Sequence, residues 1–399
     1  MPGVVGVIGA GTMGAGIAQL AIESGHPVLL HDVDAEAIER GRTRIRTGLE
    51  RRAARLELDA DSADEWVAGR LALIENRETV EAVAEGSELV VEAALEDLEA
   101  KRSIFRILDR SAHDDTLLAT NTSALSVTEI AGATTLRARV LGLHFFNPAP
   151  VMPLVEVVAA PATSEASLVR ATAIVTRWGK VPVRCGDAPG FIVNRVNRPF
   201  TLEPLAMLAT GEGTVDGIDA AVRAAGYPMG PFELMDLIGI DINLAAALGI
   251  YERTRRDADP LAIRFRPSPI QERLVAEGRL GRKTGAGFYA YGPDGRPVGA
   301  AQNLSVDIIG MDRLPDDTIA ERITLAIINE AYRALGDGVA RAADIDLAMR
   351  LGASHPAGPF ERTQTLGGTS PLLDALRRYA AHGPRFDPAP ALFESRPPG

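Results

Sequence analysis

Short apolar runs alternate with longer amphipathic stretches through the first half of the chain. The runs are "VVGVI", "PVLL", "ELVVE" and "TLLAT". Each run predicts a short buried strand, and the stretches between them predict helices. This alternation predicts a Rossmann-like α/β fold with a doubly wound parallel sheet. Polar residues follow two of these strands, where such sheets bind ligands. They are Glu92 and Glu96 after one strand, and Asn121, Thr122 and Ser123 after the next.

The loop "GAGTMG" joins the first strand to the first helix. Its first glycine permits a tight turn, its second lets the backbone approach a pyrophosphate, and its third lets helix and strand pack closely. The helix N-terminus adds free N–H groups and partial positive charge. The residues that we expect to hold a dinucleotide here are Gly9, Gly11, Thr12, Met13 and Gly14.

An acidic residue ends the second strand. Asp32 lies 23 residues after Gly9, where a carboxylate would accept hydrogen bonds from both hydroxyls of the adenosine ribose. The same charge would repel a 2′-phosphate, and no arginine precedes Arg40. The expected cofactor is therefore NAD and not NADP.

The segment "VLGLHFFNPAPVMPLVEVV", residues 140–158, predicts two strands around a turn with three prolines. This arrangement leaves His144 and Glu156 on adjoining segments. By themselves, these residues fit either a catalytic pair or a core histidine with a satisfied hydrogen bond. Ser123 is similarly ambiguous, because it is also a candidate N-cap for a helix at "SVTEIAG".

A long predicted helix follows the second strand and holds seven arginines between positions 40 and 55. Because the whole chain has a net charge of −11, this helix is the natural local site for the phosphates of an anionic ligand. The alternative is a solvated face with pairs such as Glu36–Arg40. The residues expected near one face are Arg40, Arg44, Gly48, Arg51 and Arg55.

Composition narrows the class of protein. A content of 46% hydrophobic and 24% charged residues is ordinary for a globular protein. The acidic balance argues against nucleic acid or an anionic membrane as the main partner. A single cysteine, Cys185, argues against a disulfide framework and a zinc cluster, and we expect no metal. No apolar run reaches membrane-spanning length, and the N-terminus resembles neither a signal nor a transit peptide. We expect a cytoplasmic protein.

The C-terminal half contains an internal repeat. Residues 195–223 match 322–350 without gaps, and "GPFE" at 230 recurs at 358. We expect a Rossmann-like domain at 1–186 and two tandem all-α domains at 187–295 and 296–399. Asn194 is matched by Glu321, so the second copy is expected to be structural. It could form an internal pseudo-dimer, which leaves a monomer and a homodimer both open. The proline-rich tail "PRFDPAPALFESRPPG" is expected to be irregular or frayed.

Taken together, these motifs resemble the L-3-hydroxyacyl-CoA dehydrogenases, including the 3-hydroxybutyryl-CoA type, over residues 1–295. The resemblance rests on "GAGTMGAGIAQ", "VVEAALEDLEAK", "NTSALSVTEIA", "GLHFFNPAPVMPLVEVV", "GDAPGFIVNR" and "GRLGRKTGAGFYAY". It implies a catalytic histidine at His144, oriented by Glu156, with Ser123 and Asn194 at the reacting end of the substrate.

The resemblance also implies where cofactor and coenzyme A bind. Gly48 and Arg55 stand where the family touches the CoA nucleotide through a serine and a lysine, so a hydroxyl contact is lost here. The expected cofactor-side residues are Asn121 at the strand end and, from the resemblance, Glu96, Lys101, Asn147 and Lys283.

The implied reaction is NAD-dependent oxidation of an L-3-hydroxyacyl-CoA to the 3-oxoacyl-CoA, as in fatty-acid metabolism. Its chemistry needs a base, an orienting carboxylate and a pocket, because the cofactor accepts the hydride. Three alternatives stand beside it: a β-hydroxyacid dehydrogenase, whose catalytic lysine "PGFIVNRVNRPF" lacks, a dehydrogenase of a free hydroxy or sugar acid, and a non-enzymatic NAD-binding protein. Acyl chain length, a distal carboxylate as in 3-hydroxyadipyl-CoA, direction and a separate enoyl-CoA hydratase partner all stay open.

Overall fold

The computed structural model describes residues 3–301 and 314–394. The chain divides into two compact units, residues 1–187 and 188–399. Both helical copies lie in the second unit, so their separation into two domains stays a prediction. Within the described residues, no single helix is long and apolar enough to cross a membrane. One bent pair, Pro231–Ile238 with Ile240–Arg256, passes that test of length and composition only when its helices are taken together.

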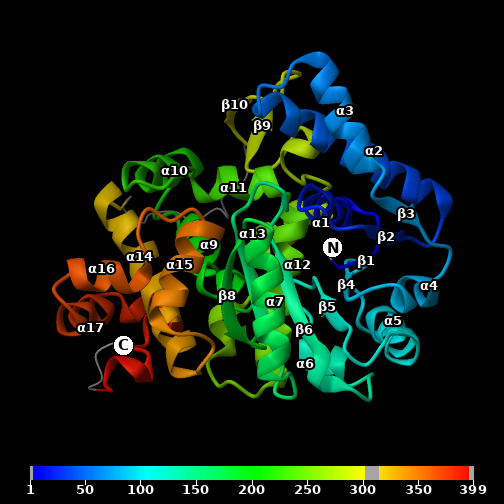
Figure 1. Ribbon diagram of the computed structural model, residues 1–399. Coiled ribbons are helices and arrows are strands. Elements are labelled where there is room, and N and C mark those ends of the chain that lie inside the picture. The colour runs from blue at the N-terminus through cyan, green and yellow to red at the C-terminus, as the bar shows by residue number, and fades with distance from the viewer. Residues whose placement is uncertain (1–2, 302–313, 395–399) are drawn as a thin grey trace. The chain divides into compact units, whose positions relative to one another are not determined.

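The first unit is built on one eight-stranded sheet with the order β3-β2-β1-β4-β5-β6-β7-β8 (Figure 1). Neighbouring strands run parallel except β6 and β7, which are antiparallel. The expected doubly wound sheet is confirmed, with the hairpin of β6 and β7 added to it. The strands are β1 Val5–Ile8, β2 Val28–His31, β3 Ile74–Asn76, β4 Leu89–Glu92, β5 Leu117–Thr120, β6 Val140–Phe145, β7 Leu154–Ala159 and β8 Val181–Gly186.

Helices cover both faces of this sheet. One core cluster joins the strands to α1, α2, α3 and α7, and a second joins them to α4, α5 and α6. The sheet is therefore buried on both sides, which explains why its strands read as continuous apolar runs. The helices are α1 Thr12–Glu23, α2 Ala35–Arg55, α3 Ala60–Leu71, α4 Val80–Glu85, α5 Leu98–Ser111, α6 Val127–Ala131 and α7 Glu165–Arg177, with a 3₁₀ turn at Arg137–Arg139.

Side-chain caps fix where several of these helices begin. Asp34 accepts a hydrogen bond from the N–H of Ala37 at the start of α2. At α6 the cap is Ser126, which accepts from the N–H of Glu129 at 3.2 Å. The alternative of Ser123 as the cap of "SVTEIAG" is therefore wrong, because Ser126 already satisfies the helix.

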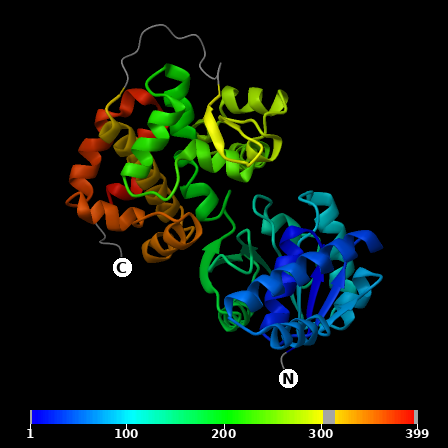
Figure 2. The ribbon, with the colours of Figure 1, turned by 90° about the horizontal axis from the view of Figure 1, so that it is seen from above.

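The second unit is almost entirely helical (Figure 2). A small antiparallel hairpin, β9 Tyr289–Tyr291 with β10 Pro297–Ala300, follows the first helical copy. The first copy contains α8 Val193–Val196, α9 Pro199–Thr210, α10 Val215–Ala224, α11 Pro231–Ile238, α12 Ile240–Arg256 and α13 Pro269–Ala276, with 3₁₀ turns at Ala262–Phe265 and Arg282–Thr284. The second copy contains α14 Asp316–Gly336, α15 Ala342–Gly352, α16 Pro359–Thr365 and α17 Thr369–Arg378, with 3₁₀ turns at Ala380–His382, Pro384–Phe386 and Pro390–Leu392.

Equivalent residues of the two copies pair reciprocally in the core of this unit. Arg195 of the first copy donates from Nε to Glu330 of the second at 2.8 Å. Arg322, the repeat equivalent of Arg195, donates from Nε to Glu203, the repeat equivalent of Glu330, at 2.9 Å. Such an exchange is the signature of a two-fold interface between like surfaces. Here both halves of the interface belong to one chain.

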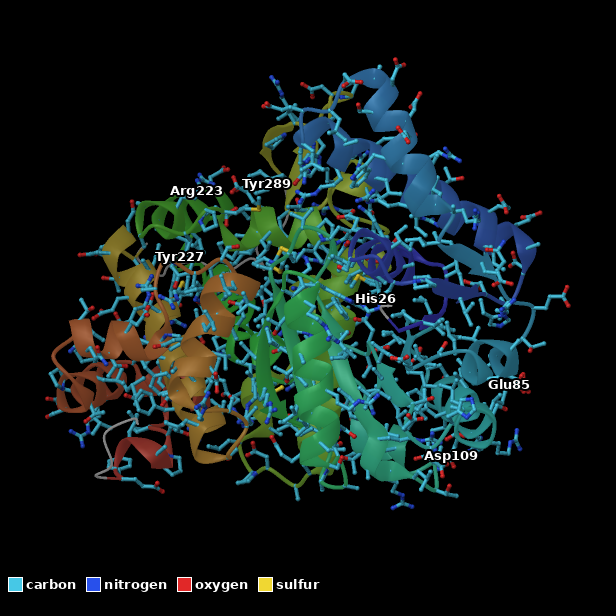
Figure 3. All side chains as sticks on the ribbon, in the orientation of Figure 1. His26, Glu85, Asp109, Arg223, Tyr227 and Tyr289 are labelled. Atoms are coloured by element: carbon cyan, nitrogen blue, oxygen red, sulfur yellow. The ribbon has the colours of Figure 1, made fainter. Side chains whose placement is uncertain are left out.

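A buried aspartate organises the same turn in both copies. Asp219 accepts hydrogen bonds from the N–H groups of Phe232 and Glu233, at 2.9 and 3.0 Å, and so caps α11. Asp346 caps α16 in the same way, at 2.8 and 3.2 Å. In the hairpin after the first copy, Tyr289, labelled in Figure 3, also donates to Asp219 at 2.8 Å. The repeated sequence thus encodes a repeated packing unit.

The C-terminal tail folds against α14 up to residue 394. Phe386 is fully buried, and the side chain of Asn329 donates to the carbonyls of Arg385 and Asp387 at 2.8 and 2.7 Å. This part of the tail is irregular, with short 3₁₀ turns only, but it is not frayed, since apolar side chains and a buried amide anchor it. Residues 395–399 lie outside the described residues.

Candidate active site

The glycines of the first loop are required by different contacts. Gly9 has a φ of +99°, and a Cβ there would meet the carbonyl oxygen of Ala93 at 2.5 Å. A Cβ on Gly14 would lie 1.8 Å from the Gly9 oxygen, so only glycine lets α1 start so close to β1. A Cβ on Gly11 would meet no atom within 4 Å. The backbone at Gly11 is therefore open to a ligand, at a helix start without a side-chain cap.

Asp32 stands beside this loop at the end of β2. Its Oδ2 accepts from the N–H of Ala10 at 2.6 Å, and its Oδ1 accepts from the N–H of Val33 at 2.7 Å. The loop and the carboxylate thus form one unit, with a place for a pyrophosphate and a ribose. Thr12 is exposed in the first turn of α1, whereas Met13 packs against the sheet core. These residues fit NAD.

A buried ion-pair network lies at the ends of β4 and β5. The ammonium of Lys101, with 1% of its side chain exposed, donates to Glu92 at 2.7 Å and lies 3.3 Å from Glu96. Glu96 in turn accepts from the hydroxyl of Thr122 at 2.6 Å and from the N–H of Ser123 at 3.0 Å. Lys101 therefore holds Glu96 in place, and a contact of either residue with the cofactor stays a prediction.

Burial by itself would raise the pKa of Glu96. The charge of Lys101 and the hydrogen bonds from Thr122 and Ser123 outweigh it, so the pKa of Glu96 lies below its ordinary value. Glu96 is consequently a fixed anion that positions the loop after β5, and with it the side chain of Ser123.

His144 and Glu156 face each other directly. They are paired residues in the antiparallel ladder of β6 and β7, and both are buried. His144 Nδ1 lies 2.5 Å from Glu156 Oε2. A carboxylate at Nδ1 favours the tautomer that carries its proton there, so Nε2 has the lone pair that a base needs. Asn121 ties the neighbouring strand ends together, because its Oδ1 accepts from the N–H of Phe145 at 2.9 Å.

A cavity of about 680 Å³ runs along α1 in the first unit. We call it the arginine groove. Helix α2 forms one wall, and residues 147–153 and 178–180 form others; Asn147 lies on this lining. Its charged lining residues are Arg44, Arg51, Arg52, Arg55, Lys180 and Glu23.

One expectation for the arginine helix needs correction. Arg40 does not line the groove but pairs with Glu36 at 3.3 Å in an exposed site, as the solvated-face alternative required. Arg52 lines the groove in its place. Gly48 lines the groove as expected, and its lack of a side chain leaves room for the amide of Gln19, whose oxygen would lie 2.0 Å from a Cβ there. Coenzyme A contact at Gly48 stays a prediction.

Two expected site residues belong to the second unit. Asn194 lies on the short helix α8. Lys283 lies in a 3₁₀ turn, and its ammonium contacts both carboxylate oxygens of Asp241, at 2.6 and 2.7 Å. Their contacts with the residues of the first unit stay predictions.

The described residues contain no group of three or more His, Cys, Asp and Glu side chains that could hold a metal ion. A glycine loop with an acidic ribose partner, together with a buried histidine–carboxylate pair on the same sheet, defines the class as an NAD-dependent oxidoreductase.

Comparison with known proteins specifies the family. The model of the 3-hydroxyacyl-CoA dehydrogenase NAD binding domain matches residues 4–188, and the model of the C-terminal domain of that family matches residues 190–291 and 319–394. The chain belongs to this family. The second of the C-terminal matches covers the repeated copy, which the resemblance over residues 1–295 had left out.

Individual relatives agree with this assignment. The chain is 36% identical to the 3-hydroxyadipyl-CoA dehydrogenase of Escherichia coli K12, over 91% of this chain and 90% of that one. It is 42% identical to the human mitochondrial hydroxyacyl-coenzyme A dehydrogenase, over 72% of this chain and 90% of that one. A crystal structure of 3-hydroxybutyryl-CoA dehydrogenase from Escherichia coli K12 superposes with a TM-score of 0.85, at 35% identity, over 98% of this chain and 97% of that one.

Sequence reasoning missed Arg52 and Lys180 in the groove. Arg52 was present in the arginine-rich helix, and a wider helical face would have included it. Lys180 carried no signal, because "WGK" lies far along the chain from α2 and reaches the groove only through the fold.

Proposed function

We propose that this chain catalyses the reversible NAD-dependent oxidation of an L-3-hydroxyacyl-CoA to the 3-oxoacyl-CoA, with His144 as the base and Glu156 as its partner. The observation that carries the proposal is the 2.5 Å contact between His144 Nδ1 and Glu156 Oε2, made across paired positions of two core strands. A buried carboxylate held against one imidazole nitrogen suits the other nitrogen to move a proton.

In this mechanism His144 Nε2 takes the proton of the substrate hydroxyl, and Glu156 stabilises the imidazolium that forms. NAD, when bound, accepts the hydride from the carbon that bears this hydroxyl. Ser123 donates a hydrogen bond to the oxygen of the reacting carbon, and Asn194 donates to the thioester carbonyl. Glu96 positions Ser123 for this hydrogen bond, because its carboxylate accepts from the Ser123 N–H.

The CoA nucleotide binds in the arginine groove. Four guanidinium groups from one helix face this cavity, whereas the chain as a whole carries a net charge of −11. Guanidinium groups match phosphate oxygens in geometry and charge. Arg55, at the C-terminal end of α2, is the residue that we assign to a CoA phosphate.

NADH oxidation by the purified chain tests the proposal, with acetoacetyl-CoA beside free acetoacetate. We expect turnover of the thioester only, and its loss in His144→Ala. The control is His113→Ala, which removes another imidazole of the first unit, outside the sheet. Equal turnover of free acetoacetate would favour a hydroxy-acid dehydrogenase. NADH binding without turnover of any acyl-CoA would favour the binding-protein alternative.

A carboxylated six-carbon substrate is the second acyl class to compare. A relative that aligns with 91% of this chain is a 3-hydroxyadipyl-CoA dehydrogenase, and this observation favours testing 3-oxoadipyl-CoA beside acetoacetyl-CoA. A higher kcat/KM for the carboxylated thioester would assign the chain to dicarboxylic acyl-CoA metabolism. A higher value for acetoacetyl-CoA would assign it to four-carbon substrates.

We also propose that the chain acts as a monomer. The reciprocal pairs Arg195–Glu330 and Arg322–Glu203 support this, because the second copy covers the surface that a partner subunit would otherwise use. Light scattering after size exclusion should give a mass close to 42.3 kDa. A stable mass of twice that value would contradict the proposal.

A further inference from the structure

Lys180 is a buried ammonium on the wall of the arginine groove. It directly precedes β8, and 7% of the residue is exposed. Its Nζ donates one hydrogen bond, to the carbonyl oxygen of Met152 at 2.8 Å. Within the described residues no carboxylate forms an ion pair with it. An ammonium carries three N–H donors, so Lys180 keeps donors for a ligand in the groove.

The electrostatic surroundings of Lys180 suit an anion. Burial lowers the pKa of Lys180 to about 8, the charge of Glu23 on α1 acts in the opposite direction, and that of Arg52 on α2 lowers the pKa further. Glu23 is itself engaged, because its carboxylate lies 3.9 Å from Arg52 and accepts from Gln19 at 2.6 Å. A phosphate beside Lys180 would supply the negative charge that this buried cation lacks.

Lys180 also occupies a distinct wall. Arg44, Arg51, Arg52 and Arg55 all come from α2, whereas Lys180 comes from the segment between α7 and β8. Among the described cations that line the groove, Lys180 alone lies outside α2. A ligand bound to both walls is held on two sides, which restricts its orientation more than one row of arginines can.

We propose that Lys180 binds a phosphate of the coenzyme A nucleotide and so completes, from a segment outside α2, the anion site that the arginines of α2 begin. This inference rests on the proposed function for the identity of the ligand. Lys180 is a specificity residue for the nucleotide end of the substrate and takes no part in the chemical step.

Kinetics with two thioesters test the role. Acetoacetyl-CoA carries the nucleotide, and acetoacetyl-pantetheine lacks it. In Lys180→Gln we expect KM for acetoacetyl-CoA to rise about tenfold, the lower end for a hydrogen bond to a charged group. KM for acetoacetyl-pantetheine, KM for NADH and kcat should not change. The matched control is Arg177→Gln, an exposed cation three residues earlier that does not line the groove.

Two further readouts separate binding from folding. Lys180→Arg should restore most of the affinity for acetoacetyl-CoA, because it restores the charge. In the wild type, KM for acetoacetyl-CoA should rise as the pH passes about 8, where Lys180 loses its proton, and this rise should be absent for the pantetheine thioester and in Lys180→Gln. Equal effects of Lys180→Gln on both thioesters, or none on either, would overturn the inference.

Direct binding distinguishes this inference from the proposed function. Adenosine 3′,5′-bisphosphate, which carries the 3′-phosphate and the first 5′-phosphate of the CoA nucleotide and no acyl group, is titrated into wild type and Lys180→Gln. Weaker binding to the variant supports Lys180 as a phosphate ligand even if the wild type turns over neither thioester. Equal binding to both, or none to the wild type, overturns it.

Discussion

Replacing Glu156 by glutamine is the sharpest test of the catalytic pair. The amide has nearly the same shape as the carboxylate and can still hydrogen-bond to His144, but it carries no charge. It also offers an N–H toward Nδ1, which would move the imidazole proton to Nε2 and remove the lone pair from the substrate side. The variant therefore separates the charge and the tautomer from the packing of β6 against β7.

The size of the effect follows from the geometry. Glu156 is fully buried and its oxygen lies 2.5 Å from Nδ1, so the imidazolium formed in the reaction faces a full negative charge. Unit charges about 4 Å apart attract by about 4 kcal/mol at an effective dielectric constant of about 20. Each 1.36 kcal/mol is tenfold in rate, so the upper limit is about 10³-fold. Because the amide keeps a hydrogen bond, we expect kcat to fall ~10²–10³-fold.

The assay is NADH oxidation at saturating acetoacetyl-CoA, with NADH binding and thermal unfolding measured on the same preparation. Glu165→Gln serves as the control, since it removes a carboxylate of the same unit that is 71% exposed and pairs with Arg184. A kcat within about threefold of wild type, in a variant that still folds and binds NADH, would refute the role of Glu156.

Further predictions concern the stability of the second unit. Arg322→Met removes the buried cation between Glu203 and Glu212, although Glu203 keeps its pair with Arg385, and should lower the free energy of unfolding by about 3 kcal/mol. Arg198→Met should change it by less than about 1 kcal/mol, because this buried guanidinium contacts the amide of Asn243 and no carboxylate within the described residues. Equal losses in urea unfolding would contradict this reasoning. Burial, aided by a nearby arginine, lowers the pKa of His355 from 6.5 to about 3. As the pH falls, the unfolded chain therefore takes up a proton at this histidine before the folded chain does. Stability should therefore fall by roughly 2–3 kcal/mol from pH 6.5 to about pH 4.5, and His355→Gln should remove most of that slope in urea titrations.

Local patterns were enough to predict most of the first unit. The apolar runs are the strands of the sheet, and the glycine loop and Asp32 lie where the dinucleotide fingerprint requires them. Even the pairing of His144 with Glu156 could be predicted, because three prolines forced a turn between two strands of matching length. These features depend on short segments whose conformation is set within a few residues.

Sequence predictions failed where the same residues allowed more than one local structure. Both Ser123 and Ser126 could cap the helix, and only the course of the chain after β5 decided for Ser126. The prolines of the tail correctly indicated an irregular backbone, but fraying did not follow, because Phe386 and its neighbours bury apolar surface on α14. Proline content reports which hydrogen bonds a segment cannot make, and not which surface it can cover.

The sequence by itself determined the class of fold, the cofactor, the duplication of a helical unit and the pairing of His144 with Glu156. It did so because backbone sterics, hydrophobic periodicity and glycine requirements act over a few neighbouring residues. Only the tertiary structure decided which cations share the arginine groove, that Lys101 pairs with both Glu92 and Glu96, and that Arg195 and Arg322 each pair with a glutamate of the other copy. These contacts join residues up to 135 positions apart, as in the pair Arg195–Glu330, and depend on burial and charge in the assembled core, which no single segment contains.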